Sequence, residues 1–311
     1  MHEEASPRKT VPAPSNALPL LACLAGNVAL AFGPWFVRLA DVGPVAAGFW
    51  RIALAAPLLV AMAFMGTRRP FVGARGLGVM LVLAGIAFAA DLASWHLGIL
   101  RTTLANSTLF GNSATLMFPI YGFIVARAWP SRSQGMALAL AAIGAGLLLG
   151  RSYELSPKNL VGDLLCLLAG TLYTVYFILM AKARDTMAPL PALALSTIAS
   201  APPLLLSAVL LGETVWPGHW GALVALALVS QVIGQGLMIY AIGYLSPLVM
   251  GIALLSQPIV AGIVGWVVYG ERLGSLDFLG AALVAVALVL VRRGTVASAA
   301  AETRSDAEGA L

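Results

Sequence analysis

The chain alternates between long apolar stretches and short connections that carry most of the charges, prolines and glycines. About twenty apolar residues in a helix are enough to cross the hydrocarbon core of a bilayer. Ten stretches have a suitable length, so the pattern predicts ten membrane-spanning helices. They cover residues 18–38, 43–65, 74–98, 103–126, 134–150, 161–181, 190–211, 219–240, 247–269 and 275–291.

The stretch at residues 247–269 shows this pattern most clearly. It opens at a Ser-Pro pair, contains no charged side chain and stops at Gly270. Pro258, near its middle, removes one backbone hydrogen bond and is expected to bend the helix. A bend at this depth needs protein or a watery cavity to satisfy the freed carbonyl group.

The first five predicted spans and the last five form an internal repeat at an offset of 143 residues, which places Cys23 on Cys166 and Gly122 on Gly265. A five-helix unit crosses the membrane an odd number of times, so the second copy must run with the opposite topology. Inverted repeats of this kind recur in alternating-access carriers, whose substrate site lies near mid-membrane between the repeats. We therefore expect an all-α membrane protein of ten transmembrane helices, built as two inverted five-helix repeats.

The composition supports a membrane protein and excludes the soluble classes. Hydrophobic residues make up 60% of the 311 residues and charged residues only 10%, whereas about a quarter of a soluble chain is charged. The net charge of +5 is therefore no sign of a nucleic-acid partner. We expect one repeat at residues 18–150, the other at 161–292, and disordered tails at 1–17 and 293–311.

The basic residues predict how the chain is oriented. Ten spans place both termini on the same side, and Lys and Arg concentrate on the cytoplasmic side of membrane proteins. The side with the termini would hold twelve of the eighteen basic residues and the other side five, with Arg51 inside a span. The sequence therefore predicts a multi-pass protein of the cell's inner (plasma) membrane with both termini in the cytoplasm.

Two stretches carry a resemblance to a known family. One combines Ser246-Pro247 and Pro258 with Gly-Glu-Arg-Leu at 270–273, and the other reads Asp-Leu-Ala-Ser-Trp-His-Leu-Gly-Ile at 91–99 and Thr-Thr-Leu-Ala-Asn-Ser-Thr at 102–108. Over residues 18–292 the chain resembles the EamA-type ten-helix permeases of the drug/metabolite transporter superfamily. The first half departs from the pattern, because Thr115 stands where Pro258 stands in the second copy.

The resemblance implies a small-molecule carrier, often an exporter of amino acids or related metabolites, with no enzymatic activity and no cofactor. More distant branches carry nucleotide sugars and triose phosphates, so the substrate does not transfer with the fold. The few charges inside the spans argue against a highly anionic substrate. We expect an exporter of small amphipathic metabolites that works by alternating access, and export of drugs or other metabolites by the same fold is the alternative.

Three ionisable residues inside the predicted spans are candidates for coupling or gating, namely Arg51, Asp91 and His96. Arg51 and Asp91 would each lie about 11 Å below the outer end of their spans, and we expect them to face each other as an ion pair. The alternative is that Arg51 extends to the surface while Asp91 binds water or a hydroxyl group. His96 titrates near neutral pH and is a candidate for proton coupling, or else a hydrogen-bonded structural histidine.

Uncharged polar and aromatic residues at mid-span are the candidates for substrate binding. Amides can donate to a carboxylate and accept from an ammonium group, which suits a zwitterion. The alternative is that the amides join helices to one another and that the aromatic rings only pack. The candidates are Asn27, Trp95, Asn106, Asn112, Tyr173, Tyr176, Gln231, Gln235 and Gln257, with Pro119 and Pro258 as bend points.

Two other classes of function stay open. A lipid-processing membrane enzyme would need a cluster of polar catalytic groups near one interface, where only Asp91, Ser94 and His96 lie close together in the sequence. A scaffold without transport activity would have no central polar cavity. The sequence contains no Gly-rich phosphate loop and no metal-ligand spacing. The expected partners are a small-molecule substrate, the lipid bilayer and protons as the coupling ion, for a monomer or a homodimer.

Overall fold

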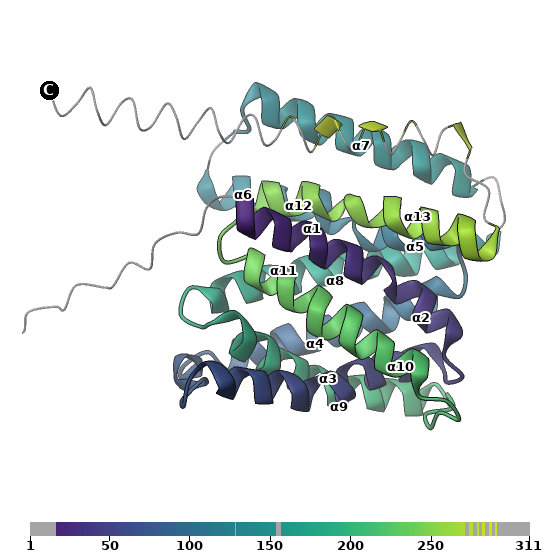
Figure 1. Cartoon of the computed structure of the whole chain (residues 1–311). Helices are drawn as coiled ribbons and strands as arrows, with labels where there is room; N and C mark the ends of the chain where they lie inside the picture. Colours follow the sequence, from purple (N-terminus) through teal and green to yellow (C-terminus); the bar gives the residue numbers. More distant parts are fainter. Residues whose placement is uncertain are drawn as a thin grey trace, which may run out of the picture.

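The computed structural model describes residues 17–127, 129–153 and 157–270, together with single residues between 274 and 290. Every regular element in this part of the chain is a helix (Figure 1). Seven helical segments, 21 to 26 residues long, are apolar enough to cross a membrane. They are Ala17–Leu39, Pro44–Gly66, Gly78–Ile99, Asn159–Arg184, Pro189–Leu210, Gly221–Ala241 and Pro247–Tyr269.

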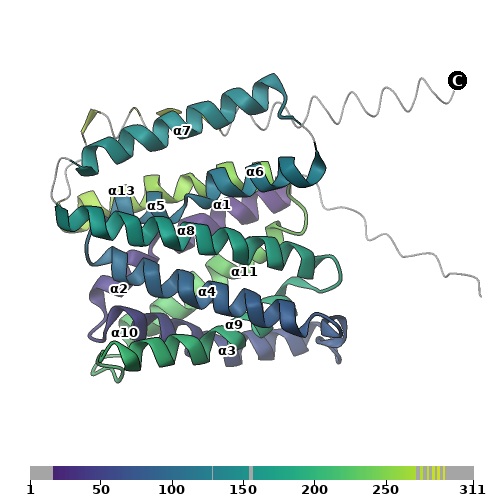
Figure 2. The ribbon, with the colours of Figure 1, turned by 180° about the vertical axis from the view of Figure 1, so that it is seen from behind.

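These seven segments lie within a few residues of seven predicted spans, which confirms an all-α, multi-pass membrane protein. The predicted span at 103–126 is divided into two helices, α5 (Leu104–Gly111) and α6 (Ala114–Ala126). The predicted span at 134–150 lies within α7 (Arg132–Tyr153), at the edge of the bundle (Figures 1 and 2). The predicted span at 275–291 lies largely outside the described residues, so the ten-helix count stays a prediction.

Two of the spanning segments in the first half are regular helices, α3 (Pro44–Gly66) and α4 (Gly78–Ile99), joined through the short 3-10 helix η1 (Val72–Ala74). The first segment is interrupted at Phe32, between α1 (Ala17–Ala31) and α2 (Gly33–Leu39). The sequence predicts one continuous helix there. Pro34 explains the interruption, because it has no backbone N–H to donate to the preceding turn and fits best in the first turn of a new helix.

The second half begins with α8 (Pro157–Arg184) and α9 (Pro189–Leu210). The next segment consists of α10 (Gly221–Ala225), the π-helix η2 (Leu226–Gln235) and α11 (Gly236–Ala241). The last described segment divides into α12 (Pro247–Leu254) and α13 (Ser256–Tyr269). The sequence does not predict the π-helix, a form that is rare and often found at functional sites.

The helices of the two halves pack against each other throughout the bundle. The helix α4 packs against α8 and α9, α3 packs against α9, and α6 packs against α12. Figure 2 shows α4 between α8 and α9. Small residues allow the close approach: a methyl group on Gly85 of α4 would come within 2.5 Å of Ala199 of α9. Such contacts drive helix association where lipid offers no hydrophobic effect.

The contacts also show which helix ends lie together. Gly98 of α4 lies directly against Cys166 of α8, so α4 ends where α8 begins. The rings of Trp50 in α3 and Trp220 before α10 are 4.8 Å apart, centroid to centroid. We name the two ends of the bundle after two arginines. The Arg38 end, toward α2 and α10 in Figure 1, contains residues 40–43, 100–103 and 211–220. The Arg184 end contains residues 67–77, 185–188 and 242–246.

Candidate functional site

A cavity lies in the interior between helices of both halves. The space open to the centre of a water molecule is about 30 Å³, so the cavity is large enough to hold water. Seven of the predicted site residues line it: Arg51, Asp91, Trp95, Asn112, Tyr173, Gln235 and Gln257. The remaining lining residues are Leu30, Phe88, Leu92, Thr108 and Gly111. The structure therefore brings both predicted charges and most of the predicted polar groups to one place.

Arg51 of α3 is the largest fully buried side chain in the described part of the chain, with 1% of its surface exposed. Its Nε donates to Gln231 Oε1 at 3.0 Å, and Gln231 Nε2 donates to Thr197 Oγ1 at 3.1 Å. Its Nη1 is buried and has no hydrogen-bond partner in the structure. Arg51 does not extend to the surface. Both ends of the Gln231 amide are occupied, so Gln231 holds Arg51 rather than facing the cavity.

Asp91 of α4 faces the same cavity and is 6% exposed. No ion pair within 4.0 Å joins it to Arg51 or to another described residue. The direct ion pair expected from the sequence is therefore absent from this conformation. Instead, the cavity is lined by the Asp91 carboxylate and by Arg51, whose buried Nη1 has no hydrogen-bond partner in the structure. Such a pair of groups can bind the opposite charges of a zwitterion.

Gln235 adds a further donor to the cavity. Its Oε1 accepts a hydrogen bond from the Tyr173 hydroxyl at 3.1 Å, whereas its Nε2 is buried and has no partner in the structure. Tyr173 is 8% exposed and stacks beside Phe88, with ring centroids 6.3 Å apart. The unpartnered nitrogens of Arg51 and Gln235 are thus two donors that a carboxylate could accept from together.

The two divided helices meet at the cavity. Asn112, in the gap between α5 and α6, donates from Nδ2 to Gln257 Oε1 in the first turn of α13. Both amides are buried and both line the cavity. Their hydrogen bond therefore joins the interruption of one half to the interruption of the other.

Asn27 lies behind this contact, outside the cavity lining. Its Nδ2 donates to the carbonyl oxygen of Ala253 at 2.8 Å, and the Ser256 hydroxyl donates to the same oxygen at 2.8 Å. The helix divides at Leu255, three residues before Pro258, and this carbonyl is in its last turn. Asn27 thus supplies the hydrogen bond that an interruption at this depth requires.

The other predicted site residues do not line the cavity. His96 is fully buried, and its Nδ1 lies 2.9 Å from the Pro44 carbonyl oxygen. Since that oxygen can only accept, Nδ1 carries the proton. The ring of Tyr176 stacks on Phe88 with centroids 4.5 Å apart. Asn106 lies in the first turn of α5, where its backbone N–H donates to Thr103, and Pro119 lies within α6.

Sequence reasoning missed the apolar side of the cavity, made of Leu30, Phe88 and Leu92 with Thr108 and Gly111. Phe88 could have been found from its position three residues before Asp91, which places both on one helix face. The rest depends on the packing of distant helices and leaves no local signal. Within the described residues there is no group of three or more metal-binding side chains.

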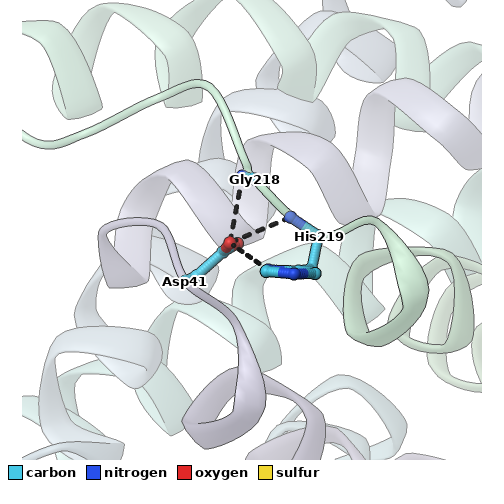
Figure 3. Close-up of polar contacts among 3 residues, drawn as sticks. All are labelled: Asp41, Gly218 and His219. Atoms are coloured by element: carbon cyan, nitrogen blue, oxygen red, sulfur yellow. Dashed lines mark hydrogen bonds and ion pairs between the residues drawn. The ribbon is translucent and has the colours of Figure 1, made fainter.

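A second polar cluster ties two connections together at the Arg38 end (Figure 3). Asp41 Oδ2 accepts hydrogen bonds from the backbone of Gly218 and His219, at 3.0 and 2.9 Å, and from His219 Nδ1 at 3.2 Å. Desolvation raises the pKa of Asp41, but the hydrogen bonds from His219 and Gly218 outweigh it, so that the pKa is lowered. Beside it, Glu213 accepts from the backbone N–H of Val45 and Ala46 in the first turn of α3.

These features define a membrane protein with a buried polar cavity, and known proteins identify its class. Residues 160–293 match the EamA-like transporter family. The chain is 28% identical over 214 residues to an uncharacterized transporter of Archaeoglobus fulgidus, covering 66% of this chain and 73% of that protein. The crystal structure of another protein shares the fold with a TM-score of 0.69 over 89% of this chain and 97% of that one, at 14% identity.

The class is therefore that of multi-pass membrane transporters. The second half of the chain, at residues 160–293, matches the EamA-like transporter family, and the relative from Archaeoglobus fulgidus is likewise described as a transporter. Proteins of this family are typically not enzymes, and a transporter implies a small-molecule substrate.

Proposed function

We propose that the protein is a secondary carrier that exports a small amphipathic metabolite, an amino acid or a close relative, by alternating access through the cavity. The observation that carries this proposal is the arrangement of unpartnered groups. Arg51 Nη1 and Gln235 Nε2 are buried donors with no acceptor, and Asp91 faces the same cavity. A substrate carboxylate would bind the two donors, and its ammonium group would bind Asp91.

The apolar side of the cavity supports an amphipathic substrate. Leu30, Phe88, Leu92 and Trp95 line it beside the charged groups. Trp95 is held in place, because its Nε1 donates to the Ser107 carbonyl at 2.9 Å. One arginine is a poor counterion for the charge of two phosphates, so sugar nucleotides fit less well. Asp91 is the group that would take up a proton if transport is coupled to protons.

Two interruptions at related positions support the ten-helix architecture of two inverted repeats at residues 18–150 and 161–292. The helix of the first half is divided after Gly111, and that of the second half at Leu255. The offset of 143 residues places Asn112 on Leu255. In this architecture the halves rock about the cavity, both termini lie in the cytoplasm, and the carrier works in the inner membrane as a monomer or a homodimer.

Counterflow in proteoliposomes tests this function. Vesicles are loaded with one unlabelled compound from a panel of amino acids and other metabolites, and entry of a labelled probe is followed with and without a pH gradient. We expect saturable exchange with one class of zwitterion, abolished in Asp91→Asn and retained in the surface control Asp185→Asn. Exchange of drugs or other metabolites without exchange of amino acids would replace the amino-acid proposal with one of those substrate classes. Absence of exchange across the panel for folded protein would favour a lipid-processing enzyme or a scaffold.

A further inference from the structure

Two half-buried arginines occupy related places at opposite ends of the bundle. Arg38 lies in the last turn of α2, and Arg184 is the last residue of α8. These helices end the first predicted span of each half. The offset of 143 places Arg38 on residue 181, less than one helical turn from Arg184.

Each arginine binds the C-terminal end of another helix in the same half. Arg38 Nη2 donates to the carbonyl oxygens of Ile99, at 3.5 Å, and Thr102, at 2.8 Å, at the end of α4. Arg184 Nε donates to the Ile239 carbonyl at 3.1 Å, in the last turn of α11, and Nη1 donates to the Met187 carbonyl. Carbonyl groups at a helix C-terminus lack intrahelical partners and carry partial negative charge, which favours a cation.

Each guanidinium group also faces an aromatic ring on a neighbouring segment. The Arg38 Cζ lies 4.8 Å from the centroid of Tyr269, the last residue of α13, and the Arg184 Cζ lies 5.9 Å from that of Tyr244, between α11 and α12. Both rings flank the long divided segment at Pro247–Tyr269. The arginines thus connect the two ends of this segment to the first helix of each half.

The geometry points to Arg38 and Arg184 as a pair of gate latches for transport, an inference that rests on the proposed carrier function. Arg38 holds the cavity closed at its end of the bundle, Arg184 holds it closed at the other, and transport releases them alternately. Both latches are made in this conformation, and the cavity lies between the two ends that they hold.

The chain offers a way to disturb one latch without replacing its arginine. Gly243 lies in the turn after α11, where a Cβ atom would come within 2.5 Å of Arg184 Nη2 and 2.9 Å of its Cζ. Gly243→Ala should therefore push the guanidinium group away from the Ile239 carbonyl. The obstructing atoms are the far end of a flexible side chain, so the backbone can stay in place.

The test measures from which side the cavity is reached. A cysteine is introduced by Leu92→Cys, and its reaction with a membrane-impermeant maleimide is followed in full-length protein reconstituted with known orientation. The reagent is supplied at one face at a time, and protein without the reporter corrects for Cys23 and Cys166. We expect Arg38→Gln to raise the labelling rate about tenfold from the Arg38 end only, and Arg184→Gln or Gly243→Ala to do so from the Arg184 end only.

Matched controls separate latch opening from a general loss of charge. Arg101 lies at the same end as Arg38 but donates to the Leu97 carbonyl of α4, the helix that it directly follows. Lys182 is exposed in the same last turn as Arg184. Arg101→Gln and Lys182→Gln should label like the parent. If Arg38→Gln does not fold, Tyr269→Leu takes its place, since it removes the ring and leaves the arginine.

Unchanged labelling, faster labelling from both faces, or an equal effect of the control variants would overturn the assignment. The assay contains no substrate, so its result is independent of which compound the counterflow panel identifies. A carrier with active exchange and unchanged labelling would keep the proposed function and lose the latches.

Discussion

The helix interruption between α5 and α6 and the one between α12 and α13 occupy related positions in the two halves, but different residues produce them. In the second half Pro258 follows the interruption by three residues and cannot donate to the preceding turn. The first half has Thr115 at the related position, and the chain still divides at Asn112 and Ser113. Asn112, at this interruption, donates a hydrogen bond across to Gln257 in the other half. The comparison teaches that only one of the two interruptions that meet at the cavity is followed, three residues on, by a proline in its new helix.

The largest effect is expected when a proline is introduced at one of two positions in α6, either next to the interruption or inside the helix. Thr115→Pro lies in the first turn of α6, where proline is tolerated, and it removes only the bond from the Thr115 N–H to the Asn112 carbonyl. Tyr121→Pro lies inside α6 and should cost about 3 kcal/mol or more. Thermal unfolding in detergent should show a far larger fall in Tm for Tyr121→Pro. Equal falls would mean that α5 and α6 act as one continuous helix.

The contact between the two interruptions should matter almost as much. Asn112→Leu leaves the buried Gln257 amide without its partner, which costs about 1–3 kcal/mol. We expect a lower Tm and counterflow reduced by about tenfold or more. Thr115→Val is the matched control, since Thr115 is equally buried and its hydroxyl has no hydrogen-bond partner in the structure. If the Asn112→Leu protein exchanges substrate as fast as this control, the hydrogen bond between Asn112 and Gln257 has no part in transport.

A smaller loss of stability is expected when the hydrogen bonds to the Ala253 carbonyl group, at the interruption between α12 and α13, are removed. Asn27→Leu removes the buried amide that donates to Ala253 and should cost about 0.6–1.7 kcal/mol. Ser256→Ala should cost less, because Ser256 is half-buried and its bond stays within one segment, whereas Asn27 is fully buried and joins two helices. Tm values for both variants and for the double variant form the measurement. A Ser256→Ala effect equal to that of Asn27→Leu would show that Asn27 does not support the interruption.

The smallest effect is expected far from both interruptions, at the exposed contact of Asp41 with His219. Folding lowers the pKa of Asp41 below its ordinary value of 3.8, so the contact stabilises the protein above that value. The stabilisation is lost as the pH falls through the lowered pKa. Tm curves of the parent and of Asp41→Asn should therefore differ slightly at neutral pH and converge in strong acid. Curves that converge instead near neutral pH would assign the titration to another group.

Much of the fold could be predicted from the sequence, because membrane spans are recognised by the length and hydropathy of their apolar stretches. The segment at 247–269 begins and ends where the sequence predicts, and Pro258 indicates its bend. The interruption at Asn112 could not be predicted, because its partner Gln257 lies 145 residues away. The π-helix η2 likewise depends on packing against other helices, and no local residue pattern marks it.

The sequence predicted most of the polar residues that line the cavity. It did not predict which partners these residues contact. Buried charges are rare in spans, which is why Arg51 and Asp91 stand out in the sequence. The sequence did not indicate that Gln231 holds Arg51, that Asn27 supports a carbonyl group, or that Arg51 and Asp91 stay apart. These outcomes depend on which neighbours a side chain meets, and spacing along one helix does not determine them.

The most direct test of the account is to join the two interruptions chemically and measure exchange. Asn112→Cys and Gln257→Cys place two thiols where the two interruptions meet, and a short reversible bifunctional reagent links them in reconstituted protein. The baseline is the exchange that this double variant keeps before linking, which is expected to be reduced because the hydrogen bond between Asn112 and Gln257 is lost. The account predicts that exchange stops when the link is complete and returns when the link is cleaved, with single-cysteine proteins unaffected by cleavage. Exchange that continues through fully linked protein would contradict it, because the substrate would then cross the membrane without movement where the two interruptions meet.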